Sequence, residues 1–255
     1  MTRSPNELFD LTGKAALITG GSRGLGREMA LAFARAGADV VIVSRKLDSC
    51  ERTAAEVEAL GRRALPYACH VGSWSDLDGL VDAAYGRFGK LDVLVNNAGM
   101  SPLYPSLVEV SEALWDKVIA VNLKGAFRLS ALVGSRMAAG AGGSIINVSS
   151  TAAIRPSPVE TPYGAAKAGL NALTIAFARA YGPKVRVNCI MPGPFLTDIS
   201  KAWDLDAVNK RLEAMAALKR AGDPGEIVGA ALYFASDASS FTTGAILRVD
   251  GGLGI

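Results

Sequence analysis

The sequence has very little histidine and cysteine, the side chains that most often build metal sites and disulfide frameworks. Its only histidine is His70, and no motif pairs it with a serine or with a second metal ligand. The three cysteines, Cys50, Cys69 and Cys189, are odd in number and widely spaced, so they match neither a disulfide framework nor a zinc spacing. We therefore expect no metal site, no catalytic role for His70, and buried thiols in a reducing compartment.

The sequence also lacks a strong charge imbalance and a long uncharged apolar run. Its formal net charge is +3 and its basic residues are scattered, which predicts no surface for nucleic acid and no polybasic membrane patch. The first ten residues contain no run typical of a signal peptide, and no later stretch is long and uncharged enough to suggest a membrane span. We expect a cytoplasmic protein that acts on a small molecule.

What the sequence does contain is a regular alternation of strand and helix patterns. Its 255 residues, half of them apolar, suffice for one substantial core, so residues 1–255 are expected to form a single domain. Apolar runs typical of buried parallel strands cover Ala15–Thr19, Val40–Val43, Ala64–Val71, Leu91–Val95, Ser144–Ser149, Val185–Ile190 and Ala245–Val249. Helical patterns cover Leu25–Ala36, Leu47–Leu60, Trp74–Phe88, Ser111–Met137, Thr161–Tyr181 and Pro224–Ala235. With right-handed crossovers, this order predicts an α/β fold with a doubly wound, seven-stranded parallel sheet and helices on both faces.

The first predicted strand ends in a glycine-rich turn that opens a helix. Gly20, Gly24 and Gly26 would allow backbone N–H groups to approach a pyrophosphate at the positive end of that helix. The spacing differs from the common G-x-G-x-x-G pattern, and a flexible strand-to-helix turn is the alternative interpretation. The position of the turn between a buried strand and a helix favours a dinucleotide phosphate site.

The end of the second predicted strand is where a dinucleotide fold meets the adenosine ribose. The residues there are Ser44, Arg45 and Lys46, so no carboxylate is available to accept from a ribose 2′-hydroxyl. Arg45 and Arg23 could clamp a 2′-phosphate through charge-assisted bonds, although both also suit ordinary solvated surface positions. We predict NADP(H) in preference to NAD(H).

A tyrosine and a lysine lie four residues apart near the start of a predicted helix. Tyr163 and Lys167 therefore share one helical face, downstream of a strand that ends at Ser149 and Ser150. Such a pair is more often a half-buried ring beside a surface amine, but this one lies where open α/β sheets bind ligands. Bringing a phenol from its ordinary pKa of ~10 to neutrality requires roughly 4 kcal/mol, which Lys167 and a cofactor's positive ring would supply together.

Three motifs together resemble the short-chain dehydrogenase/reductase (SDR) family. They are TGGSRGLG from Thr19 to Gly26, NNAG from Asn96 to Gly99, and the spaced set Ser150, Tyr163 and Lys167. The resemblance covers nearly the whole chain. It implies a Rossmann fold and a reversible hydride transfer between a nicotinamide cofactor and a carbonyl or secondary alcohol.

The resemblance also implies roles for individual residues. Ser150 and Tyr163 would bond the carbonyl oxygen, with Tyr163 as the acid or base. Lys167 would bond the nicotinamide ribose and lower the pKa of Tyr163. Asn122, an amide on an otherwise apolar helix face that must find buried partners or mark a helix distortion, would hold a water beside that lysine. The implied cofactor contacts are Gly20, Ser22, Arg23, Gly24, Leu25, Gly26, Ser44, Arg45, His70, Val71, Asn97, Ala98, Gly99, Tyr163, Lys167, Pro192, Gly193, Phe195 and Thr197.

Three further questions stay open in the sequence. His70 stands where SDR proteins commonly carry an aspartate that contacts adenine, so its role there is unassigned. Residues 194–218 mix apolar and charged side chains and are expected to form a substrate lid. A partly apolar pocket is suggested by Leu103, Tyr104, Ile154, Val159, Phe195 and Trp203, which equally suit loop packing.

Several functional alternatives accompany this interpretation. A 3-oxoacyl thioester reductase of the fatty-acid type is the alternative within the enzyme class, and a non-catalytic NADP(H)-binding regulatory protein or a scaffold is the alternative outside it. SDR proteins are commonly tetramers or dimers joined through the helices that correspond to those around Asn122 and Tyr163. We therefore expect a homo-oligomer.

Overall fold

A computed structural model of the protein describes residues 4–197, 200 and 205–253. Seven parallel strands form one sheet in the order β3-β2-β1-β4-β5-β6-β7. The strands are β1 (Ala15–Thr19), β2 (Asp39–Ser44), β3 (Ala64–Ala68), β4 (Val93–Asn96), β5 (Gly143–Val148), β6 (Val185–Pro192) and β7 (Ile246–Val249). This order confirms the predicted doubly wound sheet, in which the direction of winding reverses between β1 and β4.

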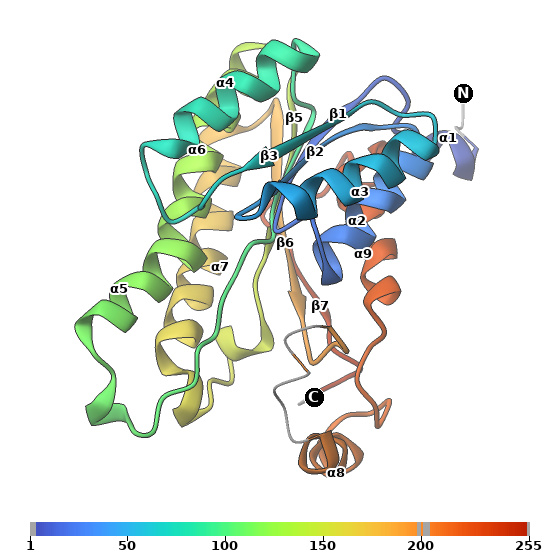
Figure 1. The fold of residues 1–255 in the computed structure, drawn as a ribbon. Coiled ribbons are helices and arrows are strands. Elements are labelled where there is room, and N and C mark those ends of the chain that lie inside the picture. The colour runs from blue at the N-terminus through green and yellow to red at the C-terminus, as the bar shows by residue number, and fades with distance from the viewer. Residues whose placement is uncertain (1–3, 198–199, 201–204, 254–255) are drawn as a thin grey trace.

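Helices cover both faces of the sheet (Figure 1). One face carries α4 (Asp76–Phe88), α5 (Glu112–Ile119), α6 (Gly125–Ala139) and α7 (Thr161–Tyr181). The other face carries α2 (Gly24–Arg35), α3 (Leu47–Ala59) and α9 (Val228–Ala235), with the short α1 (Pro5–Phe9) on the same side. The remaining helix, α8 (Leu205–Met215), lies beyond the ends of β6 and β7.

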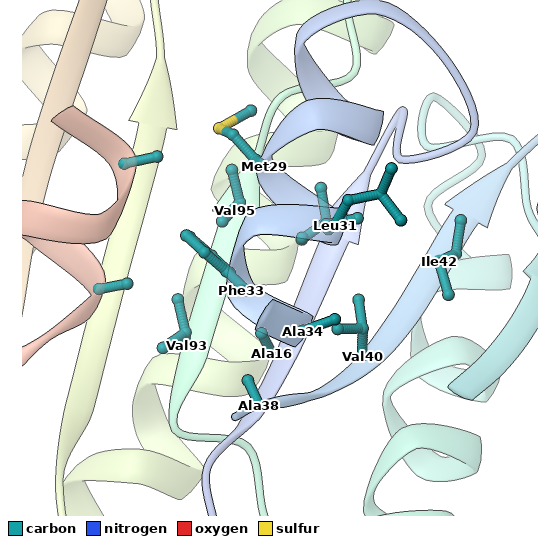
Figure 2. Close-up of a cluster of buried hydrophobic side chains, with 14 of the residues drawn as sticks. Ala16, Met29, Leu31, Phe33, Ala34, Ala38, Val40, Ile42, Val93 and Val95 are labelled. Atoms are coloured by element: carbon teal, nitrogen blue, oxygen red, sulfur yellow. The ribbon is translucent and has the colours of Figure 1, made fainter. Parts of the chain in front are cut away.

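Two apolar layers hold these helices on the sheet. Residues of β1 alternate between them, with Ile18 in the layer under α2 and Leu17 in the layer under α4 and α6, so the strand is apolar throughout. In the first layer, Met29 and Phe33 of α2 lie over the sheet beside the side chains of β4 (Figure 2). The Phe33 side chain is fully buried, which contributes ~1.5–3 kcal/mol to stability.

Two differences from the predicted bounds of the elements affect the site. The third strand ends at Ala68, which pairs with Ser44 of β2, so His70 and Val71 lie in the loop that follows instead of in the strand. The long helix predicted over Ser111–Met137 consists of α5 and α6 joined by a π-helical turn at Ala120–Lys124. Such a turn is a common distortion where a side chain bonds the helix backbone, as Asn122 does here.

The stretch Glu112–Ala139 is long and apolar enough, by length and composition, to cross a membrane. This finding corrects the expectation that no segment of the chain passes that test. Half of its most apolar window is buried inside the protein, and α6 packs against α4, α7 and the sheet. Packing within the domain therefore accounts for its apolar composition.

The expected lid over residues 194–218 is described in part, and Trp203 lies outside the described residues. Within the described part, Leu212 of α8 and Ala216, which follows the helix, form a small apolar cluster with Ala221, apart from the two main layers. The Leu218 amide donates to the Gly251 carbonyl at 2.9 Å. The end of α8 is thus attached to the turn that follows β7.

Candidate active site

The glycine turn after β1 approaches the end of β4 so closely that side chains would not fit. A Cβ atom at Gly26 would lie 2.2 Å from the Gly20 carbonyl oxygen and 2.5 Å from Asn97 Nδ2. Gly20 and Gly24 have φ angles of +65° and +51°, which side chains rarely tolerate. The turn leads directly into α2, whose first amides have no partner within the helix. This bare backbone at a positive helix end fits the pyrophosphate of a dinucleotide.

Hydrogen bonds between β1 and the Asn-Asn-Ala-Gly motif fix the position of this turn. Thr19 Oγ1 accepts from the amides of Asn97 and Ala98 at 3.0 and 3.1 Å. Asn97 Nδ2 donates to the Thr19 carbonyl at 2.9 Å. These bonds tie the end of β1 to the loop that follows β4. Thr19 itself was not predicted, and its position as the polar last residue of a buried strand was the available signal.

The two predicted phosphate-binding arginines lie at the same edge of the sheet. The Gly21 amide donates to the Val43 carbonyl at 3.1 Å, which joins the glycine turn to the end of β2. Arg23 and Arg45 are both exposed in the loops that follow β1 and β2. Ser44 turns back on its own loop, since its Oγ donates to the Lys46 carbonyl at 3.2 Å. Two cations at this edge fit a 2′-phosphate better than a neutral hydroxyl.

His70 is held by its own loop at the predicted adenine position. Its Nδ1 accepts from the Gly72 amide at 3.2 Å, so in the neutral ring Nε2 carries the proton and can donate to a ligand. Val71 is buried, and its carbonyl oxygen would lie 2.1 Å from a Cβ atom at Gly125, at the start of α6. The loop that contains His70 and Val71 therefore presents a hydrogen-bond donor and packs closely against the start of α6.

Asn122 is buried in the π-helical turn with all of its polar atoms bonded. Its Nδ2 donates to the carbonyls of Met100 and Val118 at 2.9 Å each, and its Oδ1 accepts from the Met100 amide at 3.1 Å. This confirms the predicted buried amide and its association with a helix distortion. A Cβ atom at Gly99 would lie 2.9 Å from Asn122 Oδ1 and 3.5 Å from Lys167 Nζ. Asn122 and Lys167 thus meet at Gly99.

Ser150, Tyr163 and Lys167 converge at the carboxyl end of β5. Lys167 Nζ donates to the Val148 carbonyl at 2.7 Å and lies 5.6 Å from the centre of the Tyr163 ring. Ser150 Oγ accepts from the Ala152 amide at 3.1 Å and keeps its own proton for another acceptor. Ser149, which no sequence argument identified, donates from Oγ to the Lys167 carbonyl at 3.1 Å.

Burial shifts both titratable groups of this site toward their neutral forms. It raises the pKa of Tyr163 to about 12, an effect that the Ser150 side chain opposes and the Glu160 carboxylate reinforces. It lowers the pKa of Lys167 to about 8. The expected lowering of the Tyr163 pKa is therefore not produced by the protein's own groups, because desolvation outweighs the opposing Ser150 hydrogen bond. Bringing this phenol to neutrality requires about 7 kcal/mol instead of roughly 4.

A buried polar ladder behind the site joins α7 to the sheet. Asn96 Nδ2 donates to Asn147 Oδ1 and to Ser130 Oγ, both at 2.9 Å. Asn147 Nδ2 in turn donates to Thr174 Oγ1 of α7 at 2.9 Å. The ladder was not predicted, and two asparagines within apolar strands were its only trace in the sequence. It fixes the helix that carries Tyr163 and Lys167 against β4 and β5.

The segment after β6 returns to the glycine turn. A Cβ atom at Gly24 would lie 3.5 Å from the Thr197 side chain, which places Thr197 beside the glycine turn. The Gly193 amide donates to the Val249 carbonyl at 3.0 Å, so Pro192 and Gly193 are fixed against β7. The Phe195 ring is buried and would meet a Cβ atom at Gly222 at 2.7 Å. The ring therefore packs in the core, as the loop-packing alternative predicts, and it also lines a recess together with Leu218 and Val249.

Comparisons with known proteins agree with this geometry. A family model described as enoyl-(acyl carrier protein) reductase matches residues 20–254. A short chain dehydrogenase/reductase of Aspergillus oryzae is 40% identical over 253 residues, which cover 97% of each protein.

Two solved structures are similar over nearly their full length. One is a 7α-hydroxysteroid dehydrogenase complexed with NADH and 7-oxo glycochenodeoxycholic acid, with a TM-score of 0.94 and 34% identity over 99% of this chain and 98% of that one. The other is an NADPH-dependent 3-quinuclidinone reductase from Rhodotorula rubra, with a TM-score of 0.92 and 32% identity over 99% and 95%. Because one of these proteins is complexed with NADH and the other is NADPH-dependent, the fold alone does not determine the nucleotide.

Proposed function

Because the chain belongs to the short-chain dehydrogenase/reductase family, whose members act on alcohol or carbonyl groups with a nicotinamide cofactor, we propose that it interconverts a ketone and a secondary alcohol with NADP(H). The observation that carries the proposal is the convergence of Ser150, Tyr163 and Lys167, since Ser150 bonds Tyr163 and Lys167 Nζ lies 5.6 Å from the centre of the Tyr163 ring. This cluster lies on the same edge of the sheet as the glycine turn, where open α/β folds bind ligands.

The residues at this edge fit a nicotinamide dinucleotide. The glycine turn offers backbone amides without side chains, and the Thr197 side chain stands within contact distance of that turn. When bound, the nicotinamide supplies the hydride to the carbonyl carbon, or accepts it in the reverse direction. The protein's own task is to hold the carbonyl oxygen and to move one proton.

Tyr163 performs the proton transfer in this proposal. In the reductive direction its hydroxyl gives a proton to the carbonyl oxygen as the hydride reaches carbon, and in the oxidative direction the phenolate takes that proton back. The Ser150 hydroxyl donates a hydrogen bond to the same oxygen. With a Tyr163 pKa of about 12 in the protein alone, Lys167 and the positive charge of the oxidised cofactor must act together to make the phenolate accessible.

Lys167 and Asn122 support this transfer. Lys167 has a pKa lowered to about 8, so it is still mainly protonated at neutral pH and keeps a positive charge at the site. Its ammonium bonds the Val148 carbonyl and has further donors for a ribose hydroxyl. Asn122 holds Met100 in place and, in this proposal, orients a water next to Lys167 that returns the proton.

A preference for NADP(H) is supported by the exposed Arg23 and Arg45 and by the lack of an acidic residue at the end of β2. The direct test is to measure Michaelis constants for NADPH and NADH with one carbonyl substrate. A lower constant for NADPH supports the preference, and equal constants contradict it.

A 3-oxoacyl thioester is the second candidate substrate class. It is favoured by a relative named 3-oxoacyl-[acyl-carrier-protein] reductase from Thermotoga maritima, which is 37% identical over 95% of this chain and 98% of its own length. It is also favoured by the apolar side chains of Leu103, Ile154 and Val159, which are 74%, 51% and 51% exposed. A screen of NADPH oxidation with acetoacetyl coenzyme A and with free ketones separates the two classes. Failure to oxidise NADPH with any of them, combined with firm NADPH binding, favours the regulatory alternative.

Assembly into a homo-oligomer is also proposed. Trp115, Phe127 and Ile175, on α5, α6 and α7, are 42%, 40% and 42% exposed, which leaves apolar surface on the helices expected to join the subunits. Light scattering after size-exclusion chromatography gives the mass directly. A monomer at micromolar concentration contradicts this part of the proposal, and the cytoplasmic location stays a prediction.

A further inference from the structure

Tyr104 connects the loop after β4 to the start of α7. Its hydroxyl accepts from the Thr161 amide at 2.7 Å and donates to the Pro158 carbonyl at 2.7 Å. One phenol therefore satisfies two backbone groups that lie 57 and 54 positions further along the chain. Bonds of this length between distant segments indicate a defined attachment.

The start of α7 lacks the caps that usually satisfy a helix N-terminus. The N-cap residue, Glu160, makes no side-chain bond to the helix amides, and Pro162 in the first turn has no amide hydrogen. The Thr161 amide is thus the first helix donor that needs an outside acceptor, and Tyr104 provides it. Tyr163 follows two residues later, so the attachment lies immediately beside the proposed acid.

The same loop is held at its other end by the site. Both the amide and the carbonyl of Met100 bond the Asn122 side chain. Pro102 and Tyr104 line the same recess as Pro162 and Tyr163. Residues 100–104 therefore extend from the Asn122 and Lys167 side of the site to the Tyr163 side, with a polar side-chain attachment at each end.

We propose that Tyr104 is a positioning residue that latches loop 100–104 onto the start of α7 and so forms the substrate-facing wall beside Tyr163. This inference rests on the proposed function. The Tyr104 hydroxyl is committed to two backbone groups, so it neither donates to substrate nor replaces Tyr163. Its neighbour Leu103 is 74% exposed, and Val159, next to the bonded Pro158, is 51% exposed. The latch therefore places exposed apolar side chains next to the recess that Tyr104 and Tyr163 line.

The variant Tyr104→Phe tests the latch, because it removes the hydroxyl and keeps the ring. Tyr181→Phe is the matched control, because the Tyr181 hydroxyl attaches the other end of α7, donating to the Ala131 carbonyl at 3.3 Å. The rate of hydrogen exchange at the Thr161 amide, measured by NMR, reports whether the Tyr104 bond is formed, and it requires no substrate. We expect exchange roughly tenfold faster in Tyr104→Phe and unchanged in Tyr181→Phe. Unchanged exchange in Tyr104→Phe contradicts the latch.

Kinetics then test the positioning role, with ethyl acetoacetate and acetoacetyl coenzyme A as probes. For Tyr104→Phe we expect the KM of the carbonyl probe to rise about fivefold or more while kcat stays within about twofold and the NADPH dissociation constant is unchanged. Faster exchange of Thr161 with an unchanged KM contradicts the positioning role and leaves only a structural attachment. If the wild-type protein reduces neither these probes nor any ketone of a broad panel, the proposed function is contradicted, and the exchange of Thr161 still decides the latch.

Discussion

The proposed cofactor side of this site is formed mainly by backbone atoms, whereas the proposed substrate side is formed mainly by side chains. On the cofactor side the backbone forms the surface: Gly20, Gly24 and Gly26 bring main-chain atoms together where no Cβ atom at Gly26 would fit. On the proposed substrate side, side chains form the surface, and Tyr104 holds the loop through one bond to Thr161 of α7 and one to Pro158, which precedes that helix. Leu103 is largely exposed there.

The difference shows which part of an active site is set by local sequence. A glycine turn between a buried strand and a helix has few possible shapes, so its function can be inferred from a short motif. A wall made of side chains depends on contacts across the chain and can change without affecting the cofactor. Tyr163 and Lys167 lie between the two sides. We make four predictions that test the difference between the cofactor side and the substrate side, from the largest expected effect to the smallest.

The largest effect is expected at the boundary between the two sides. Tyr163→Phe removes the proton donor and keeps the ring, so kcat should fall by about 10²- to 10⁴-fold. The NADPH dissociation constant, measured by fluorescence titration, should stay near the wild-type value because the glycine turn is untouched. Substantial residual turnover, or a parallel loss of NADPH binding, contradicts the role given to this hydroxyl.

On the cofactor side, Gly26→Ala should disrupt the close backbone packing of the glycine turn. The added Cβ atom would lie 2.2 Å from the Gly20 carbonyl oxygen, so the turn must shift. We expect the NADPH dissociation constant to rise by about 10²-fold and stability in urea to fall by ~2–4 kcal/mol.

Gly86→Ala is the matched control for that substitution. Gly86 lies within α4, and nothing stands within 4 Å of a Cβ atom placed there. This variant should be more stable by roughly 0.5–1 kcal/mol and should bind NADPH normally, because alanine favours the helix. Equal behaviour of the two variants would show that close backbone approach is unimportant at Gly26.

Burial of Lys167 should appear in the pH dependence of stability. Its pKa is lowered from 10.5 to about 8 in the folded protein, so between these values the unfolded chain binds more protons and stability rises with pH. The contribution amounts to about 3 kcal/mol over this window.

Lys167→Met isolates that contribution, because the variant has no charge to bury. Urea unfolding of both proteins from about pH 7 to about pH 10 should show a wild-type stability that gains on the variant as pH rises. Tyr163 acts in the opposite sense above pH 10, since its raised pKa keeps the folded phenol protonated up to about 12. A constant difference between wild type and variant contradicts the lowered pKa of Lys167.

The smallest of these effects is expected at the adenosine end of the cofactor side. Arg45→Ala should reduce the preference for NADPH over NADH, measured as the ratio of kcat/KM values, by about tenfold, the loss of one charge-assisted contact. Arg136→Ala removes the same charge from α6, where Arg136 pairs with Asp82, and should leave the ratio unchanged. An equal change of this ratio in both variants would show that the preference depends on overall charge and not on Arg45.

The sequence was sufficient to predict those features of the fold and the site that depend on a local pattern of residues. The run Ala15–Thr19 and the glycines after it predicted a buried strand and the turn that opens α2, and an isolated amide among apolar residues predicted the buried Asn122 with its helix distortion. Each of these features depends on neighbours within a few residues.

The features that the sequence did not reveal all depend on distant contacts. Tyr104 and Thr161 are 57 positions apart, and no spacing rule joins them. Phe195 occurs in a loop with mixed polarity, yet it is buried because it packs on Gly222. The pKa of Tyr163 depends on how much of the folded protein surrounds the phenol, and the Tyr-x-x-x-Lys motif predicts a lowering without that desolvation.

The most direct test of the account is a spectroscopic titration of Tyr163 with and without the cofactor. The difference in phenolate absorbance between the wild-type protein and Tyr163→Phe reports this residue alone. We predict a pKa of about 12 in the free protein and a fall by several units when NADP⁺ is bound. A pKa that stays at about 12 with NADP⁺ bound, or that is already near neutral without it, contradicts the claim that protein and cofactor charge together prepare the proton donor.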